Sequence, residues 1–273
     1  MTVHGTPTAD PTRRSHLPGE TPVPSTWRQT PQKVPSSWRA TTGAPSMCPR
    51  RWYRSDGALR GATMVAMLRP AFHVLVIRHG ITGWNAAGRW QGWADIPLTD
   101  VGRAQAIAAA ERLRDDGVRF ARTVFSDLIR AAETANLMAD ILGVDERIPD
   151  PRLRERDIGE WSGLLTAEIE SQWPGQLAAW RDGRTERVPG GELESVLRAR
   201  ICSAIEDVAA DPRNTLVVTH GGVIRTLDRC YGAEPEPVAN LGGRWFGRDQ
   251  QRRGAPGDRV DLLDGPRPTS VVL

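Results

Sequence analysis

Several features that mark secreted, membrane-bound or zinc-binding proteins are scarce or missing in this sequence. It has three cysteines in 273 residues, Cys48, Cys202 and Cys230. An odd number at wide spacing suits neither a disulfide framework nor a four-ligand zinc site, so we expect free thiols in a reducing cytoplasm. No apolar run approaches the ~20 residues that span a bilayer, and the N-terminus lacks the apolar segment of a signal peptide. We therefore expect no membrane partner.

Lysine is nearly absent as well. Lys33 is the single lysine, the remaining basic residues are arginines, and the net charge is only +3. In the part that looks folded, no run of arginines is interleaved with stacking aromatic residues. We therefore expect no nucleic-acid partner.

Composition divides the chain into three segments. Residues 1–66 are rich in Pro, Ser, Thr and Arg and show no periodicity, which predicts a disordered extension, or upstream sequence translated from a misplaced start. Residues 67–248 are expected to form one folded, catalytic domain. Residues 249–273 form a tail whose Pro, Gly and Arg content leaves its order open.

Strand and helix patterns alternate in the middle segment. Continuous β-branched runs predict strands buried on both faces at 74–77, 123–125 and 216–219. Helices are expected from Thr99 to before Gly117, over 128–142, over 192–210, and from about Gly221. This alternation predicts an α/β fold, a three-layer α/β/α sandwich around a mainly parallel sheet.

Polar motifs follow three of these strands, at the edge where open α/β sheets bind ligands. The segments are 78–85, 126–134 and 219–222, and a fourth motif lies between them at 153–161. Together they supply two histidines, two arginines and a carboxylate. Arginine binds phosphate oxygens in a bidentate manner, a neutral imidazole is a nucleophile, and a carboxylic acid can protonate a leaving alkoxide. The set is sufficient for phosphoryl transfer without a metal ion or cofactor.

These motifs resemble the histidine phosphatase superfamily, which includes the cofactor-dependent phosphoglycerate mutases. The similarity covers residues 72–232. Its parts are Arg-His-Gly-x-Thr-x-x-Asn at 78–85, Gln-Gly-Trp-Ala-Asp-Ile-Pro-Leu-Thr at 91–99, Leu-x-Arg-Ala-x-x-Thr-Ala at 128–135, Leu-Arg-Glu at 153–155, Gly-x-Trp-x-Gly at 159–163, Gly-Gly-Glu at 190–192 and His-Gly-Gly at 220–222.

The resemblance implies a role for each matched residue. His79 would be phosphorylated, and Glu155 would act first as proton donor and later as base. The phosphoryl oxygens would be held by Arg78, Arg130, His220, Asn85 and the backbone N–H of Gly221, with Thr82 shaping the loop beside the phosphate. Glu155 is preferred over its neighbours Asp157 and Glu160 by its position in the motif. The tryptophans Trp84, Trp90 and Trp93 would either border the pocket or pack its loops.

Three positions depart from the family pattern. Asp127 stands where proline is commoner, Leu193 where serine is commoner, and Ile158 where an aromatic residue is frequent. None belongs to the catalytic set. At Leu193 we expect a hydrogen bond near the lid to be missing.

The length of the lid favours hydrolysis over mutase chemistry. A mutase must keep water from its phosphorylated intermediate, and its lid lies between the acid and the second histidine. Here Glu155 and His220 are only 65 positions apart in the sequence, and the mutases carry a longer insertion. We therefore expect a phosphatase acting on a small phosphorylated metabolite. The alternatives are a 2,3-bisphosphoglycerate-dependent mutase and an inactive phospho-ligand binding protein.

The sequence does not choose the substrate. The lid residues Trp173, Trp180, Arg181, Arg184 and Arg187 could recognise a sugar-bearing or anionic substrate, or could form a solvated helix face with two core anchors. The short lid is similar to that of sugar-phosphoglycerate phosphatases and of broad-specificity phosphatases. A homodimer is the one assembly that we allow for.

Overall fold

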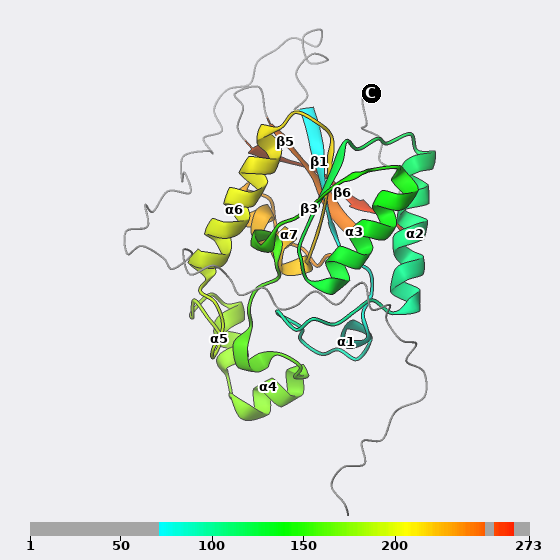
Figure 1. Ribbon diagram of the computed structural model, residues 1–273. Helices are drawn as coiled ribbons and strands as arrows, with labels where there is room; N and C mark the ends of the chain where they lie inside the picture. Colours follow the sequence, from blue (N-terminus) through cyan, green and yellow to red (C-terminus); the bar gives the residue numbers. More distant parts are fainter. Residues whose placement is uncertain (1–70, 249–253, 265–273) are drawn as a thin grey trace, which may run out of the picture. The chain divides into compact units, whose positions relative to one another are not determined.

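The computed structural model describes residues 71–248 and 254–264; the extension predicted at 1–66 lies outside them. A six-stranded sheet with the strand order β3-β2-β4-β1-β5-β6 forms the centre (Figure 1). The strands are β1 (Ala71–Arg78), β2 (Arg122–Phe125), β3 (Glu146–Pro149), β4 (Thr215–Thr219), β5 (Gly242–Arg248) and β6 (Gly254–Asp261). The strands predicted from β-branched runs are confirmed as parts of β1, β2 and β4.

The first four strands are parallel, and β5 and β6 complete the sheet as an antiparallel pair. Val218 of β4 lies between Ile77 of β1 and Phe125 of β2 in the register. The carboxyl ends of these three strands are therefore level. Side chains that follow them meet at one edge of the sheet.

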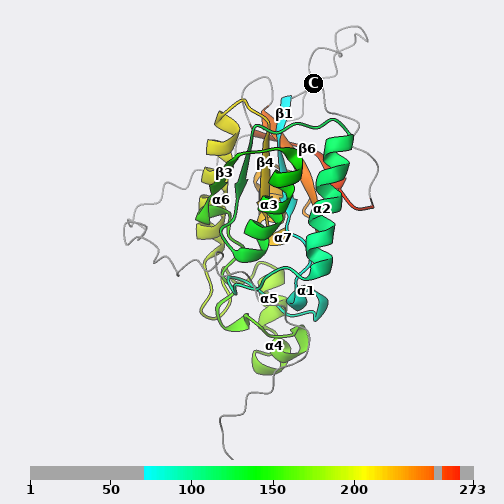
Figure 2. The ribbon, with the colours of Figure 1, turned by 45° about the vertical axis from the view of Figure 1, so that its right-hand side comes forward.

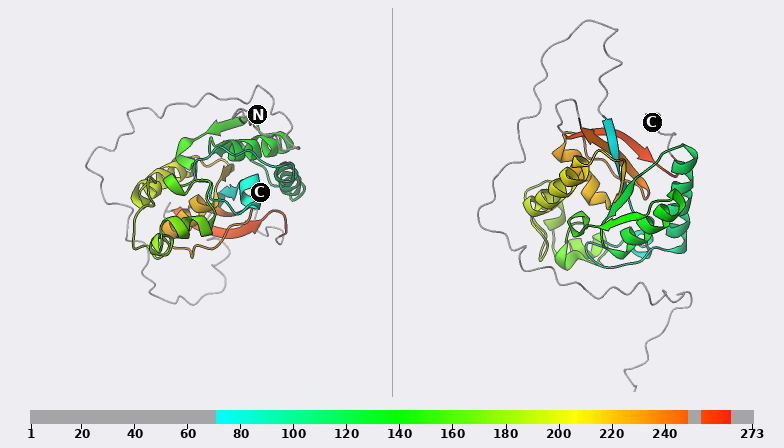
Figure 3. Two further views of the ribbon diagram at one scale, coloured as in Figure 1. Left: turned by 90° about the horizontal axis from the view of Figure 1, so that it is seen from below. Right: turned by 45° about the horizontal axis from the view of Figure 1, so that its top comes forward.

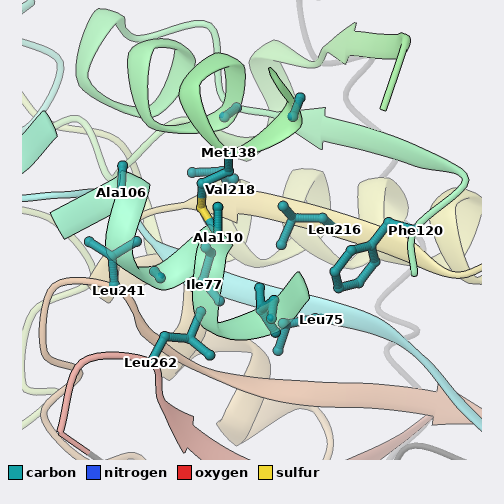
Figure 4. Close-up of a cluster of buried hydrophobic side chains, with 14 of the residues drawn as sticks. Leu75, Ile77, Ala106, Ala110, Phe120, Met138, Leu216, Val218, Leu241 and Leu262 are labelled. Carbon is teal, nitrogen blue, oxygen red and sulfur yellow. The ribbon is translucent and has the colours of Figure 1, made fainter. Parts of the chain in front are cut away.

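Two helical layers cover the sheet, as the α/β/α prediction requires. Because alternate side chains of a strand point to opposite faces, Leu75 and Ile77 pack under α2 (Asp100–Asp115) and α3 (Ile129–Leu142), as Figure 4 shows. Val74 and Val76 pack under α6 (Glu194–Ala210) and α7 (Gly221–Cys230). All four β1 side chains are fully buried.

The predicted helix ends are confirmed where local capping chemistry determines them. The Thr99 side chain caps α2 by accepting a hydrogen bond from the Gly102 N–H. Gly117 follows the end of α2 with a φ of +78°, and Gly143 ends α3 with a φ of +67°. Only glycine adopts this left-handed conformation without a steric penalty.

The tail beyond residue 248, whose order the sequence left open, contributes β6 to the edge of the sheet (Figure 3). A buried carboxylate connects this hairpin to α7. Asp228 is fully buried and forms ion pairs of 2.8 Å with Arg244 of β5 and with Arg259 of β6. Burial raises the pKa of Asp228, and the two guanidinium charges oppose that rise.

A lid extends from the end of the sheet at which β1, β2 and β4 finish (Figures 1 and 2). It contains η5 (Gly159–Trp161), α4 (Thr166–Gln172) and α5 (Gln176–Arg181), and η4 (Pro151–Leu153) precedes it. The lid has a small core of its own around the fully buried Trp161. The short helix α1 (Gly83–Ala86) lies at the same end of the molecule.

No helix among residues 71–248 and 254–264 is long and apolar enough to cross a membrane.

Candidate active site

The motifs predicted to converge line one cavity of about 390 Å³. Arg78 is the last residue of β1 and His79 follows it, Arg130 lies in the first turn of α3, and His220 connects β4 to Gly221 at the start of α7. Glu155 follows η4. Side chains that are far apart in the sequence therefore meet because their strands end at the same edge of the sheet.

His79 has a defined tautomer. Its Nδ1 lies 2.7 Å from the carbonyl oxygen of Gly80. A carbonyl only accepts, so Nδ1 carries the proton and Nε2 keeps its lone pair. The side chain is 3% exposed. Burial holds the pKa of His79 well below its ordinary value, and the charges of Arg130 and Arg78 lower it further. The imidazole is therefore neutral at physiological pH and is available as a nucleophile.

Arg130 and Arg78 are held by backbone carbonyls. Arg130 Nη1 donates to the Ala94 carbonyl at 2.7 Å and Nη2 to the Gly92 carbonyl at 2.8 Å, while Nε is buried without a hydrogen-bond partner among the described residues. Arg78 Nη1 donates to the Val238 carbonyl at 2.8 Å. Neither guanidinium forms an ion pair within the described residues. Both charges are therefore available to an anion.

Burial lowers the pKa of Arg130 to about 10, and Glu155 and Asp95 oppose that shift. Even so, Arg130 stays protonated at physiological pH.

His220 lies beside His79, with ring centroids 5.2 Å apart. Its Nε2 is 2.8 Å from the Ser126 hydroxyl, and its buried Nδ1 has no partner in the described part of the chain. Burial, followed by the charge of Arg130, lowers the pKa of His220 well below the ordinary value. His220 is fully buried and lies behind the cavity wall rather than on it.

Two backbone N–H groups position the Glu155 carboxylate. Arg156 N donates to Oε1 at 2.8 Å, and Gly222 N donates to Oε2 at 3.0 Å. A Cβ atom at position 222 would lie 2.2 Å from Glu155 Oε1, so this close approach requires glycine. The Glu155 carbonyl accepts from Trp93 Nε1 at 2.6 Å. Glu155 lines the cavity, and neither Asp157 nor Glu160 does.

Thr82 and Asn85 share a capping box at the start of α1. The Thr82 hydroxyl accepts from the Asn85 N–H at 3.1 Å, and Asn85 Oδ1 accepts from the Thr82 N–H at 3.2 Å. Asn85 lines the cavity, whereas Thr82 is fully buried behind it. Thr82 therefore positions Asn85 within the loop and does not itself line the cavity.

The departures from the family pattern have structural consequences. Asp127 forms an ion pair with Arg154 at 2.5 Å, which braces the turn that proline would otherwise stiffen. Leu193 is the N-cap of α6 and makes no side-chain capping hydrogen bond, as expected.

Asp95 lies in the segment 91–99 that matches the family pattern, and it accepts a hydrogen bond of 2.7 Å from Ile129 N at the start of α3.

Several residues of the cavity wall were not predicted from the sequence. These are Arg89, Gln91, Arg156 and Arg225. Arg225 follows Gly221 by four residues, which places the two on one face of α7; this spacing was the available signal. Of the lid residues proposed to contact a substrate, Trp180 lines the cavity together with Trp90, and Trp173 packs in the lid core. Arg181, Arg184 and Arg187 are exposed and do not line it.

Within the described ranges 71–248 and 254–264, no three His, Cys, Asp or Glu side chains gather as metal ligands would. The cavity instead presents a neutral imidazole nucleophile between two guanidinium groups, with a carboxylate at its side. This arrangement defines a class of enzyme that transfers phosphoryl groups through histidine.

Comparison with known proteins identifies the family. The model of the histidine phosphatase superfamily (branch 1) matches residues 74–241, more than half of the chain, so the chain belongs to this superfamily. The glucosyl-3-phosphoglycerate phosphatase of Mycobacterium tuberculosis is 37% identical over 187 residues, covering 63% of this chain and 81% of that protein. A 2,3-bisphosphoglycerate-dependent phosphoglycerate mutase of Methylobacterium radiotolerans is 38% identical over 163 residues, covering 56% of this chain and 76% of that protein.

A solved structure of the mycobacterial glucosyl-3-phosphoglycerate phosphatase, in complex with VO3, has a TM-score of 0.61 and 30% identity. The match covers 68% of this chain and 97% of that one. The chain is thus a phosphatase of the histidine phosphatase superfamily with the phosphoglycerate mutase-like fold.

Proposed function

We propose that the enzyme hydrolyses small phosphorylated metabolites without a metal ion, through a phosphohistidine at His79, and that it works in the cytoplasm. One observation carries the mechanism. The bare Nε2 of a neutral, buried His79 lies in a cavity lined by Arg78 and Arg130, neither of which is neutralised by an ion pair within the described residues. Two such charges can balance a phosphoryl dianion.

In the first step, His79 Nε2 attacks the phosphorus atom and the bond from phosphorus to the ester oxygen breaks. Arg78 and Arg130 stabilise the equatorial oxygens, and the buried His220 lies against the His79 ring from behind the cavity wall. The protonated Glu155 carboxyl gives its proton to the departing alkoxide. The products of this step are the free alcohol and phospho-His79.

In the second step, water attacks the phosphorus of phospho-His79, and the Glu155 carboxylate takes a proton from that water. The P–N bond breaks, His79 returns to its neutral state and inorganic phosphate leaves. The small lid supports water as the acceptor, because only η5, α4 and α5 stand where a longer insertion would be needed to exclude it.

A phosphate-release screen tests this proposal. The full chain is incubated with a panel of phosphomonoesters, including glucosyl-3-phosphoglycerate, with EDTA present. We expect inorganic phosphate from at least one substrate at a rate that EDTA does not change. Interconversion of 3- and 2-phosphoglycerate, dependent on 2,3-bisphosphoglycerate and without phosphate release, would instead establish a mutase. No turnover on any substrate at several pH values would favour the binding protein.

The cavity wall supports a sugar-bearing substrate as one candidate. Trp90 and Trp180 line the cavity, and their rings meet edge to face with centroids 5.7 Å apart. Indole faces stack on sugar rings and on other flat or apolar groups. Glucosyl-3-phosphoglycerate therefore belongs in the panel on structural grounds as well as through similarity.

A further inference from the structure

The Gly-Gly-Glu motif at 190–192 does not line the cavity, yet it contacts the segment that carries the acid. Glu192 N donates to the Asp157 carbonyl at 3.0 Å, and Glu192 Oε1 accepts from the Asp157 N–H at 2.9 Å. A Cβ atom at position 191 would lie 2.7 Å from the Asp157 carbonyl oxygen, so this approach of two backbones requires glycine. The motif is therefore bound to the chain two residues after Glu155.

Arg200 of α6 connects this motif to the backbone of the acid itself. Its side chain is 13% exposed and binds the Glu192 carboxylate through Nη2 at 2.6 Å and Nε at 3.1 Å. The same guanidinium donates to three backbone carbonyls, those of Arg152 at 2.8 Å, Arg154 at 2.6 Å and Glu155 at 2.8 Å. One side chain therefore binds three of the four carbonyl groups that end at Glu155.

The segment around the acid needs this support because residues 154–158 lie outside any helix or strand. Backbone carbonyls that leave water need a donor from elsewhere in the fold. Arg200 supplies donors in a planar fork of fixed geometry, from a helix that packs on the sheet. The Glu155 carboxylate is in turn held by the N–H groups of Arg156 and Gly222. Its position therefore depends on the position of the backbone that Arg200 binds.

We propose that Arg200, held by Glu192, is a positioning residue for the proton-transfer step and keeps the Glu155 carboxyl within reach of the leaving oxygen. Arg200 does not line the cavity, so it acts through Glu155 and not on the substrate. A misplacement of about 1 Å can cost about a hundredfold in rate. This inference rests on the proposed function and adds the residues that set the geometry of its acid.

The dependence of rate on the leaving group tests the positioning role. p-Nitrophenyl phosphate, phenyl phosphate and glycerol 3-phosphate release progressively poorer leaving groups, so they depend increasingly on the acid. In Arg200→Gln we expect kcat to fall about tenfold on glycerol 3-phosphate and under about threefold on p-nitrophenyl phosphate, with phenyl phosphate between them and KM nearly unchanged. Arg200→Lys keeps the charge without the fork and should recover part of the loss.

Two controls separate positioning from a general loss of stability. Arg122 is also an arginine of low exposure, 11%, that pairs with a carboxylate, Asp211 at 3.2 Å, and donates to a carbonyl of α6, that of Val208 at 3.0 Å. It begins β2, at the opposite end of the strand from the cavity. Arg122→Gln should therefore change the rates on all three substrates by the same factor. Arg200→Gln added to Glu155→Gln should cost under about twofold on glycerol 3-phosphate, because no acid remains to be positioned.

Equal losses on the three substrates in Arg200→Gln, or an undiminished further loss in the double variant, would overturn the positioning role. If the circular dichroism of Arg200→Gln differs from that of wild type, Arg200→Lys is judged by the same two criteria. Wild-type activity separates this failure from failure of the proposed function. If wild type hydrolyses p-nitrophenyl phosphate and the losses are equal, the positioning role alone is wrong. If wild type releases phosphate from no phosphomonoester, the proposed function is wrong.

Discussion

At the sheet edge, three of the side chains assigned to phosphoryl transfer are almost completely buried, whereas the lid is built from short helices around a small core of its own. His79, Arg130 and His220 are at most 3% exposed, and backbone carbonyls or a hydroxyl hold them. The lid changes direction at glycines with positive φ, namely Gly163, Gly175 and Gly183. The rigid edge supplies the chemistry that every phosphomonoester needs. The lid and rim can vary with the alcohol to be recognised.

The largest effect is expected at the sheet edge. His79→Ala removes the nucleophile and should lower kcat at least about a thousandfold on every substrate, since no other imidazole lines the cavity. Initial rates with p-nitrophenyl phosphate provide the measurement. His73→Ala, which removes a histidine from within β1, is the control. Activity of His79→Ala within tenfold of wild type would rule out the phosphohistidine mechanism.

A smaller, substrate-dependent effect is expected where the sheet edge meets the lid. Glu155→Gln keeps an oxygen for the Gly222 N–H but cannot donate a proton. We expect a loss of about a hundredfold on glycerol 3-phosphate, whose alkoxide is a poor leaving group, and a loss under about tenfold on p-nitrophenyl phosphate. Equal losses on both substrates would mean that Glu155 is not the acid.

The residues at the sheet edge were predicted correctly from the sequence, because each local pattern there is typical of a single kind of structure. A β-branched run followed by a polar motif places that motif at the carboxyl end of a buried strand, and Thr99 and Gly143 mark helix ends through capping chemistry. Arg78, His79, Arg130 and His220 lie together because three such strands are parallel and in register, and Glu155 joins them from the loop after η4. For Arg225 the only signal was its four-residue spacing from Gly221, and for Arg156 there was none, because the proximity of these two residues depends on how the lid and α7 pack.

The hairpin of β5 and β6 escaped prediction for a different reason. Pro256 lies within β6, and proline is tolerated there because β6 is an edge strand. Arg244 and Arg259 look like surface charges in the sequence, yet both pair with the buried Asp228. Strand prediction depends on apolar and polar residues that alternate along the chain. Because arginines that pair with a buried carboxylate occupy positions in β5 and β6, this alternation is lost there.

The buried histidines make stability depend on pH. The pKa values of His79 and His220 lie below the unfolded value of about 6.5. Below pH 6.5 the unfolded chain therefore binds more protons than the folded one, and the free energy of unfolding falls. The loss should reach about 1.4 kcal/mol per histidine for each pH unit below 6.5, until the folded pKa is reached.

Urea unfolding at pH 7.5 and pH 5.5 in phosphate-free buffer measures this loss. His79→Asn should show a smaller loss than wild type, because one buried titrating group is gone. Equal losses in the two proteins would contradict burial of a neutral His79. Carboxylates titrate mainly below this range, and they contribute the same background to both proteins.

The smallest effect is expected at the junction of the lid with the sandwich. Leu193 caps α6 without a side-chain hydrogen bond and is 36% exposed. Leu193→Ser supplies a hydroxyl that can accept from the N–H of Ser195, so the free energy of unfolding should rise by about 0.5–1 kcal/mol. Urea unfolding at pH 7.5 measures the gain. Leu193→Ala removes the same apolar side chain without adding an acceptor and should show no gain. If the serine and alanine variants were equally stable, the N–H groups in the first turn of α6 would already be satisfied by other groups.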